Sequence, residues 1–389
     1  MKLMFFCWAE EMRIELVHWL EYFFQYRGQF IIAPLIKQKE KSAYEKFFSQ
    51  LNQIGSNIIV KPVYLKSPDS SFRNLLNPIT LLNDSFSIFK VVNSTRPDVI
   101  VCFYLLHAYP IALISKIFNF LLCVVAMGSD VNLENNLFQR IAKDFVYRNS
   151  DIVFSASWKL KEIIEKDHGI NVTVTPSSID TSFFKPLKSK TLLRQKWNID
   201  LGKQVIITVC RLDKNKAVDT LIRSLKILNS KDTTLLIVGE GVERKNLETL
   251  AATLGVNNDV TFLGYRNRNE LIELYNLADI FALASYAEGL PRVLLEAMAC
   301  GCVPIATNVG SIGAVVTNGF NGFTVEPGNP EMFSERVKEI MSFSEEKKKS
   351  MREMARQAVV ENFESKKVLG IMVERVEALR TSQQKKETV

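Results

Sequence analysis

The sequence predicts an α/β protein with two parallel sheets, each covered by helices on both faces. Two observations lead to this fold class. Short apolar runs of strand length alternate with helical patterns through all 389 residues, which is typical of parallel sheets with helices packed on both sides. A cluster of turn residues from Pro176 to Pro186 interrupts this alternation near the middle of the chain, and it is the expected join between two domains.

The individual strands are predicted from the apolar runs in chain order. The first sheet is expected to use residues 2–8, 29–34, 57–60, 99–103, 121–126, 152–155 and 172–175. The second sheet is expected to use residues 205–210, 234–238, 260–263, 280–284, 303–306 and 322–325. Helical patterns fill the intervals, so both sheets are predicted to be doubly wound. The tail after about Glu364 is helical and charged.

The composition indicates a globular protein that does not bind nucleic acid. Hydrophobic residues make up 47% of the chain, which is enough for substantial cores, and the length fits two or three domains. The net charge is +7, and residues 1–190 carry most of it, with 22 Lys/Arg against 17 Asp/Glu. No basic run reaches the roughly 5–8 residues of a nucleic-acid patch. An acidic substrate or an anionic lipid is therefore the expected kind of partner.

Cysteine usage and hydropathy predict a cytoplasmic protein without a membrane span. The six cysteines show neither zinc-type pairing nor the spacing of a disulfide framework, so they are interpreted as reduced core residues. Cys300 and Cys302 permit a redox alternative, but both flank a predicted helix end, where core packing explains them. No signal peptide is expected, because acidic residues follow the first apolar run at once. The strongest span candidate, residues 111–127, is interrupted by Lys116 and Asn119 and falls short of about 20 apolar residues.

Two glutamates eight residues apart, Glu288 and Glu296, straddle the predicted start of a helix. Pro291 suits the first helical position and Gly301 suits the position just past the end. The helix is therefore expected over about residues 291–300, between two predicted strands.

This arrangement predicts a site for a phosphorylated ligand. In open parallel sheets, ligands bind outside the carboxyl ends of the strands, where a helix N-terminus offers N–H groups to an anion. A phosphate there would meet the amides near Leu290 and Arg292, while Glu288 and Glu296 accept hydrogen bonds from hydroxyl groups. The alternative is that both glutamates are solvated side chains on an ordinary amphipathic helix.

Further loops with candidate binding residues follow other predicted strands. Arg211 and Lys216 lie in the loop after the first strand of the second sheet, where their charges would offset a leaving diphosphate. Gly239 and Gly241 follow the next strand and let a ligand approach the backbone. The third glycine of a dinucleotide fingerprint is absent, so NAD is not inferred. A solvated basic loop and a simple turn are the ordinary interpretations.

Taken together, these residues resemble a known family. The motifs are Arg211…Lys216, Gly239-Glu240-Gly241, Phe262-Leu263-Gly264-Tyr265, Ser285-x-x-Glu288-Gly289-Leu290-Pro291, Glu296-Ala297-Met298-Ala299-x-Gly301 and Asn321-Gly322-Phe323. In this order and spacing they resemble retaining glycosyltransferase family 4. The segment from Thr175 to Pro186 resembles the family's interdomain segment, and Gly128-Ser129-Asp130 resembles a landmark of its acceptor domain. The resemblance is strong over residues 205–325 and weak over the first 95.

The resemblance implies a GT-B fold. This fold consists of two Rossmann-like, doubly wound parallel-sheet domains facing across a cleft, with a C-terminal helix that crosses back to the first domain. Residues 1–185, with the helix of about 367–389, would form the acceptor-side domain, and residues 186–366 would bind the nucleotide sugar. No further cofactor is implied. A UDP-sugar is the expected donor, with a GDP-sugar as the alternative.

The resemblance also implies roles for individual residues. Arg211 and Lys216 would bind the diphosphate, Glu296 the ribose hydroxyls, and Glu288 the hydroxyls of the transferred sugar, with Arg211, Lys216 and Glu288 as the catalytic set. The donor site would further include Gly239, Gly241, Tyr265, Arg266, Gly289 and Leu290, and the acceptor side Gly128, Ser129 and Asp130. Fixed cations lower the barrier as charge grows on the diphosphate. No Asp-x-Asp occurs in the sequence, which argues against a metal site.

Some positions depart from the family pattern. Met127 stands where a histidine commonly precedes Gly-Ser-Asp, and Gly310-Ser311-Ile312-Gly313-Ala314 stands where Gly-Gly-x-x-Glu is common. His107 follows a predicted strand end, and it is either a partial replacement for the missing imidazole or a hydrogen-bonded structural residue.

The sequence thus predicts a retaining, metal-independent hexosyltransferase that acts on a saccharide or lipid-linked acceptor, in cell-surface polysaccharide or glycolipid synthesis. Two alternatives remain open, a GT-B nucleotide-sugar epimerase and a catalytically weakened partner subunit of a glycosyltransferase. The aromatic helix predicted over residues 12–26 would permit peripheral contact with an anionic membrane on its cytoplasmic face. Packing of that helix onto the first sheet is the simpler interpretation.

Overall fold

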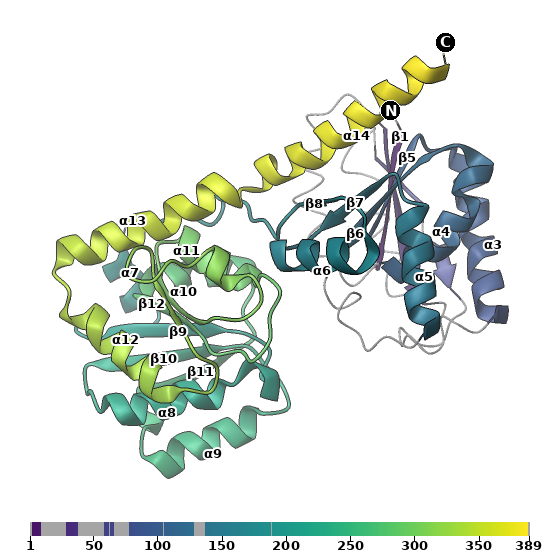
Figure 1. Cartoon of the computed structure of the whole chain (residues 1–389). Coiled ribbons are helices and arrows are strands. Elements are labelled where there is room, and N and C mark those ends of the chain that lie inside the picture. The colour runs from purple at the N-terminus through teal and green to yellow at the C-terminus, as the bar shows by residue number, and fades with distance from the viewer. Residues whose placement is uncertain are drawn as a thin grey trace. The chain divides into compact units, whose positions relative to one another are not determined.

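Two parallel sheets form the frame of the structure, one in each of two units (Figure 1). The computed structural model describes residues 2–8, 29–37, 58–61, 63–65, 78–103, 105–127, 137–187 and 189–387. The first unit comprises Met1–Pro176 with Leu369–Val389, and the second comprises Ser177–Val368. The predicted α/β class is confirmed by this arrangement.

The sheet of the first unit has eight strands, all paired in parallel. They are β1 (Lys2–Trp8), β2 (Gln29–Lys37), β3 (Ile58–Val60), β4 (Val63–Leu65), β5 (Val99–Phe103), β6 (Leu121–Ala126), β7 (Ile152–Ser155) and β8 (Val172–Val174). Their order is β3-β2-β1-β5-β6-β7-β8, with β4 also paired to β2. Every strand predicted for this sheet is present. The structure adds β4 and extends β2 by three residues beyond its predicted end.

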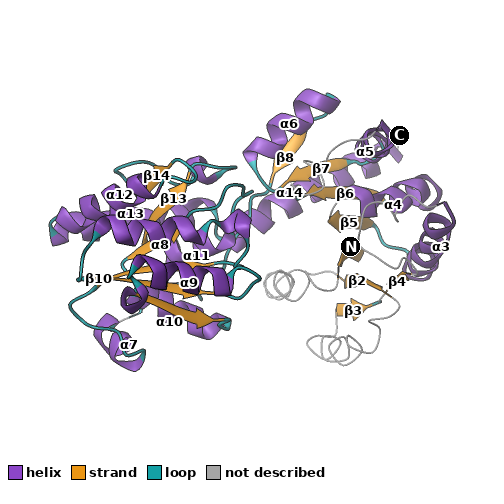
Figure 2. Ribbon diagram, turned by 90° about the horizontal axis from the view of Figure 1, so that it is seen from below, coloured by secondary structure: helices purple, strands orange, loops and turns teal. Residues whose placement is uncertain are grey.

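The helices of this unit, visible around the sheet in Figure 2, are α3 (Pro78–Thr95), α4 (Leu105–Phe118), α5 (Leu137–Arg148) and α6 (Trp158–His168). All five residues of β5 and all six of β6 are buried, which is why both read as continuous apolar runs. Ring contacts join Phe89 to Phe118 and Tyr109 to Phe145, with centroids 5.1 and 5.3 Å apart. None of the described helices is long and apolar enough to cross a membrane.

The sheet of the second unit has six parallel strands in the order β11-β10-β9-β12-β13-β14. They are β9 (Gln204–Val209), β10 (Thr233–Val238), β11 (Val260–Gly264), β12 (Ile280–Leu283), β13 (Val303–Thr307) and β14 (Phe323–Val325). The helices of this unit are α7 (Lys190–Lys196), α8 (Val218–Leu228), α9 (Arg244–Leu254), α10 (Arg268–Leu277), α11 (Arg292–Ala299), α12 (Pro330–Ser342) and α13 (Glu345–Asn362). The last helix, α14 (Ser365–Glu387), begins in this unit and belongs to the first unit from Leu369 onward. All six predicted strands are present, each within two residues of its predicted ends.

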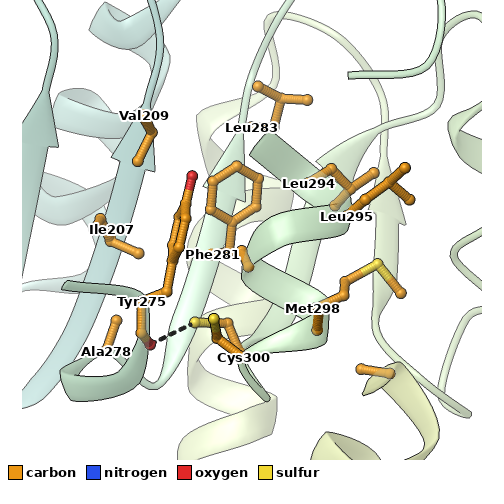
Figure 3. Packing of buried hydrophobic residues seen from close by; sticks show 14 of the residues in the cluster. Ile207, Val209, Tyr275, Ala278, Phe281, Leu283, Leu294, Leu295, Met298 and Cys300 are labelled. Carbon is orange, nitrogen blue, oxygen red and sulfur yellow. Dashed lines mark hydrogen bonds between the residues drawn. The ribbon is translucent and has the colours of Figure 1, made fainter. Parts of the chain in front are cut away.

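Alternate residues of the second sheet face two separate cores. Ile207 and Val209 of β9 belong to the core that α10, α11 and α13 cover, whereas Ile206 belongs to the core that α8, α9 and α12 cover. This alternation is expected of strands that are buried on both faces. Figure 3 shows the first core, where the rings of Tyr275 and Phe281 lie between β9 and α11 with centroids 6.2 Å apart.

At the amino end of β12, the buried carboxylate of Asp279 joins several elements. It accepts hydrogen bonds from the Val205 backbone N–H and the Arg194 guanidinium, both at 2.8 Å, and it contacts the Lys190 ammonium. Arg352 of α13 adds a third cation, 3.7 Å from Oδ1. A single carboxylate therefore links α7, β9 and α13.

The charge of Asp279 is maintained in spite of its burial. Burial raises the pKa of this carboxyl, but the Lys190 ammonium, the bond from Val205 and the Arg194 guanidinium outweigh burial and hold the pKa below its ordinary value. A lowered folded-state pKa adds stability above the pKa of the unfolded state, about 3.9, and that stability is lost as the pH falls through the folded value.

We predict that Asp279→Asn lowers the free energy of unfolding by about 3 kcal/mol at neutral pH, because it leaves the buried Arg194 without its anion. Urea denaturation of the full chain between about pH 3 and pH 7 measures this. The difference from wild type should shrink as the pH falls below about 4, because the unfolded state protonates this carboxyl before the folded state does. Asp219→Asn is the control, since Asp219 forms a surface pair with Arg223 worth less than about 1 kcal/mol. A loss for Asp279→Asn no larger than for this control contradicts the prediction.

Candidate functional site

The candidate site lies at the carboxyl ends of β9 and β12, the two central strands of the second sheet. From β9 the chain continues to β10 and β11 on one side, whereas from β12 it continues to β13 and β14 on the other. The strand order thus reverses between β9 and β12, and in open parallel sheets a ligand binds beyond the strand ends at such a switch point. The loops that follow these two strands, residues 210–217 and 284–291, meet there.

The loop after β9 is held in shape by Asp213. Its carboxylate accepts hydrogen bonds from the backbone N–H groups of Asn215 and Lys216 and so caps the short 3₁₀ helix Lys214–Lys216. Arg211 Nε donates to the same carboxylate at 2.7 Å, while the Arg211 side chain stays 79% exposed. Burial raises the pKa of Asp213, but the Arg211 guanidinium and the two N–H groups bring it below its ordinary value. Arg211 is therefore an oriented cation that is open to solvent.

Two hydrogen bonds fasten this loop to the loop after β12. The Tyr286 N–H donates to the Asn215 carbonyl at 2.8 Å, and Asn215 Nδ2 donates to the Ala287 carbonyl at 3.0 Å. On the other side, Thr307 Oγ1 at the end of β13 donates to the Ser285 carbonyl at 2.7 Å. Three neighbouring strand ends thus hold the segment that carries Glu288.

Lys216 and Glu288 form an ion pair where the two loops meet. Lys216 Nζ lies 2.7 Å from Glu288 Oε1, and Ser285 Oγ donates to the same oxygen at 2.7 Å. The Glu288 side chain is 11% exposed and that of Lys216 is 22% exposed, so both reach solvent from a mostly buried position. Glu288 Oε2 receives no hydrogen bond from the described part of the chain.

Glu296 lies in a different environment, in the second turn of α11. Tyr275 of α10 donates its hydroxyl hydrogen to Glu296 Oε2 at 3.2 Å. Burial raises the pKa of Glu296, against the opposing effects of Arg292, the Tyr275 bond and Arg268. The two predicted carboxylates therefore differ, since one is ion-paired and the other is bonded to a neutral phenol.

The start of α11 requires a small correction to the sequence analysis. Pro291 was predicted at the first helical position, but its backbone is extended (φ −72°, ψ 125°), so it is the N-cap and the helix runs from Arg292 to Ala299. None of the described side chains caps this helix. Leu290 is buried at 7% exposure, and a Cβ added at Gly289 would meet no atom within 4 Å.

Gly239 and Gly241 are explained by packing within the protein. A Cβ at Gly239, where φ is +131°, would lie 1.8 Å from the Cys210 carbonyl oxygen, and a Cβ at Gly241 would lie 2.2 Å from the Leu212 carbonyl oxygen. The backbone after β10 therefore touches the backbone after β9. These glycines bring the two loops together whether or not a ligand is present.

Tyr265 and Arg266 follow β11 at the same edge of the sheet. Tyr265 is 78% exposed. The Arg266 guanidinium lies over the Trp197 ring, 5.5 Å from its centroid, and within 3.5 Å of Glu270. Tyr265 is therefore open to a ligand, whereas Arg266 is partly engaged within the protein.

The predicted residues of the first unit can be placed only in part. His107 lies in the first turn of α4, and its side chain is outside the described residues, as are Gly128, Ser129, Asp130 and the helix predicted over residues 12–26. Met127 follows β6 directly and is half-buried.

Three residues that the sequence motifs do not name also belong to the site. Asn215 and Thr307 hold the loops, and Tyr275 bonds to Glu296. The only signal for Tyr275 is a phenol within an apolar helix pattern, and such a phenol usually finds a polar partner. Among the described residues, no group of three or more His, Cys, Asp or Glu could hold a metal ion.

Comparison with known proteins relates much of the second unit to one family. The model of "Glycosyl transferases group 1" matches residues 189–358. N-acetyl-alpha-D-glucosaminyl L-malate synthase of Bacillus anthracis is 31% identical over 252 residues, which are 64% of this chain and 63% of that protein. D-inositol 3-phosphate glycosyltransferase of Rhodococcus jostii is 28% identical over 52% of this chain and 48% of its own length. The chain thus aligns with about half to two thirds of these relatives.

Solved structures match nearly the whole chain. HepE of Anabaena in complex with UDP has a TM-score of 0.79 at 20% identity, covering 98% of this chain and 100% of HepE. The lipopolysaccharide outer core galactosyltransferase WaaB has a TM-score of 0.70 at 16% identity, covering 96% and 99%. These matches establish the GT-B fold that the motifs implied. Residues 189–358 therefore match the glycosyl transferases group 1 family, and the chain has the GT-B fold of solved glycosyltransferases.

Proposed function

We propose that this protein transfers a hexosyl unit from a nucleotide diphosphate sugar to a saccharide or lipid-linked acceptor, with retention of configuration and without a metal ion. The observation that supports this most is the Lys216–Glu288 pair at the switch point of the second sheet. The Lys216 ammonium can bind a phosphate and the Glu288 carboxylate can bind sugar hydroxyls. The two groups lie close enough to contact the same ligand.

The cations account for departure of the diphosphate. As the bond between the anomeric carbon and the diphosphate oxygen breaks, its electron pair stays on that oxygen. The acceptor oxygen forms the new bond to the same carbon, and its proton passes to the leaving diphosphate. Lys216 has N–H donors beyond the one that reaches Glu288, and Arg211 is held by Asp213 with most of its surface exposed. Fixed positive charge stabilises the developing negative charge more than it stabilises the ground state.

The carboxylates account for recognition of the donor. Glu288 Oε1 is engaged by Lys216 and Ser285, so Oε2 is the atom available to hydroxyls of the transferred sugar. Glu296 would accept hydrogen bonds from the ribose. The structural relative HepE has been solved with UDP and with UDP-glucose, which supports a UDP-sugar as the donor. A GDP-sugar is the alternative.

The first test is donor binding by the full chain. Thermal unfolding with UDP-glucose, UDP-galactose, UDP-N-acetylglucosamine and GDP-mannose should show at least one Tm that rises with the logarithm of ligand concentration. Glu288→Gln should weaken that response relative to wild type, because a neutral amide replaces the carboxylate that accepts sugar hydroxyls. Glu335→Gln, on the exposed side of α12, should not.

The outcomes separate the alternative functions. Binding of no nucleotide sugar refutes the proposal. Donor binding without turnover supports a partner subunit, and epimers formed without acceptor support an epimerase. Turnover that Glu288→Ala abolishes excludes the partner subunit.

A second prediction concerns Lys216. Lys216→Met should lower kcat/KM by about 100-fold or more, the usual cost of losing one group that stabilises transition-state charge. Lys214→Met is the matched control, because Lys214 lies in the same 3₁₀ helix and is exposed. Initial rates with the donor from the panel measure both variants. Equal effects of the two substitutions contradict a specific role for Lys216.

A further inference from the structure

Tyr275 occupies an unusual position for a polar side chain in the second unit. It lies on α10 with no exposed surface, among the strands and helices of the core that contains α11. In Figure 3 its ring extends from the Ala278 end of the core toward Val209, the last residue of β9, so the hydroxyl points toward the carboxyl ends of the strands. There the hydroxyl donates to Glu296 Oε2 at 3.2 Å. No other described group donates a hydrogen bond to this carboxylate.

The tyrosine is held firmly at both ends. Its ring makes edge contacts with Phe184 and Phe281, each at 6.2 Å between centroids. Its backbone carbonyl accepts a hydrogen bond from the Cys302 thiol at 3.0 Å. A side chain packed in this way has little freedom to move. The Tyr275 hydroxyl therefore sets the position of the Glu296 carboxylate.

The charges around Glu296 come from two helices. Arg292 precedes Glu296 by one turn on α11, and Arg268 and Tyr275 face it from α10, with Cys300 and Cys302 beyond Tyr275. Burial, Glu296 and the two thiols all raise the pKa of Tyr275 well above its ordinary value, so the phenol stays a neutral donor. Burial raises the pKa of Glu296, and the bond from Tyr275 opposes that rise.

We propose that Tyr275 is a positioning residue for nucleotide binding: it holds Glu296 Oε2 so that the other oxygen, Oε1, accepts hydrogen bonds from the ribose hydroxyls. This inference rests on the proposed function, because it takes the ligand to be a ribonucleotide. It adds a residue that touches no ligand and that gives the site its preference for ribose over deoxyribose.

The test compares UDP with 2′-deoxyuridine diphosphate, which lacks one ribose hydroxyl, by calorimetric titration of the full chain. Wild type should bind UDP about tenfold more tightly, the value of a hydrogen bond to a charged group. Tyr275→Phe should bind UDP more weakly and so lose most of that preference. Its affinity for the deoxynucleotide should change by less than about twofold. GDP and its deoxy form replace the uridine pair if the donor panel selects a GDP-sugar.

A pH series provides a second readout. The preference for UDP requires ionised Glu296, so it declines as the pH falls through the Glu296 pKa. Because the Tyr275 bond lowers that pKa, its removal should shift the decline to higher pH.

Three variants complete the design. Glu296→Gln should also remove the preference, and adding Tyr275→Phe to it should cause no further loss, since coupled residues are not additive. Tyr147→Phe, at a buried tyrosine of the first unit, should change neither affinity.

Equal weakening of UDP and its deoxy form in Tyr275→Phe overturns the inference, because it shows a merely structural role. Additive losses in the double variant overturn it as well. If wild type binds neither UDP nor GDP, the proposed function itself fails, and that result precedes any variant.

Discussion

The pairing of β9 with β12 is the constraint on which the candidate site depends. Residues Ile206 and Ile207 align with Ile280 and Phe281, so the loops after these strands start side by side although about 70 residues separate them in the chain. Asn215 converts this proximity into fixed contacts with the loop that carries Glu288. If the strands paired in another order, the same loops would lie at different places along the sheet edge.

Glu288 and Glu296 have identical side chains but different surroundings, which suit them to different roles. Glu288 has a cation and a hydroxyl on one oxygen and reaches solvent. Glu296 is also largely buried, but it depends on a neutral phenol and on guanidinium groups that do not bond to it directly. An ion pair suits a site where charge changes during a reaction, whereas a buried carboxylate with a fixed hydroxyl suits discrimination between neutral ligands, since unpaired buried groups are costly.

The sequence predicted every strand but β4, because strands that are buried on both faces read as short apolar runs, as β5, β6 and β9 do. It located α11 to within one residue, because the fixed φ of Pro291 suits its start and Gly301 can adopt the positive φ (89°) found just past its end. It did not reveal why Gly239 is a glycine, because the atom that excludes a side chain there belongs to Cys210, in the loop after another strand. Contacts between segments distant in sequence, such as Tyr275 with Glu296, leave no local pattern from which they could be derived.

The position of Asp279 separates residues that stabilise the second unit from residues that bind the ligand. It stands directly before β12, and Ser285 stands just after it, so the four-residue strand separates the charged cluster from the ligand loops by more than about 13 Å. Substitutions that far apart usually act independently. Substitutions around Asp279 can therefore change the stability of this unit without altering ligand preference. Substitutions in the loops at the carboxyl ends of the strands can alter ligand preference without changing stability.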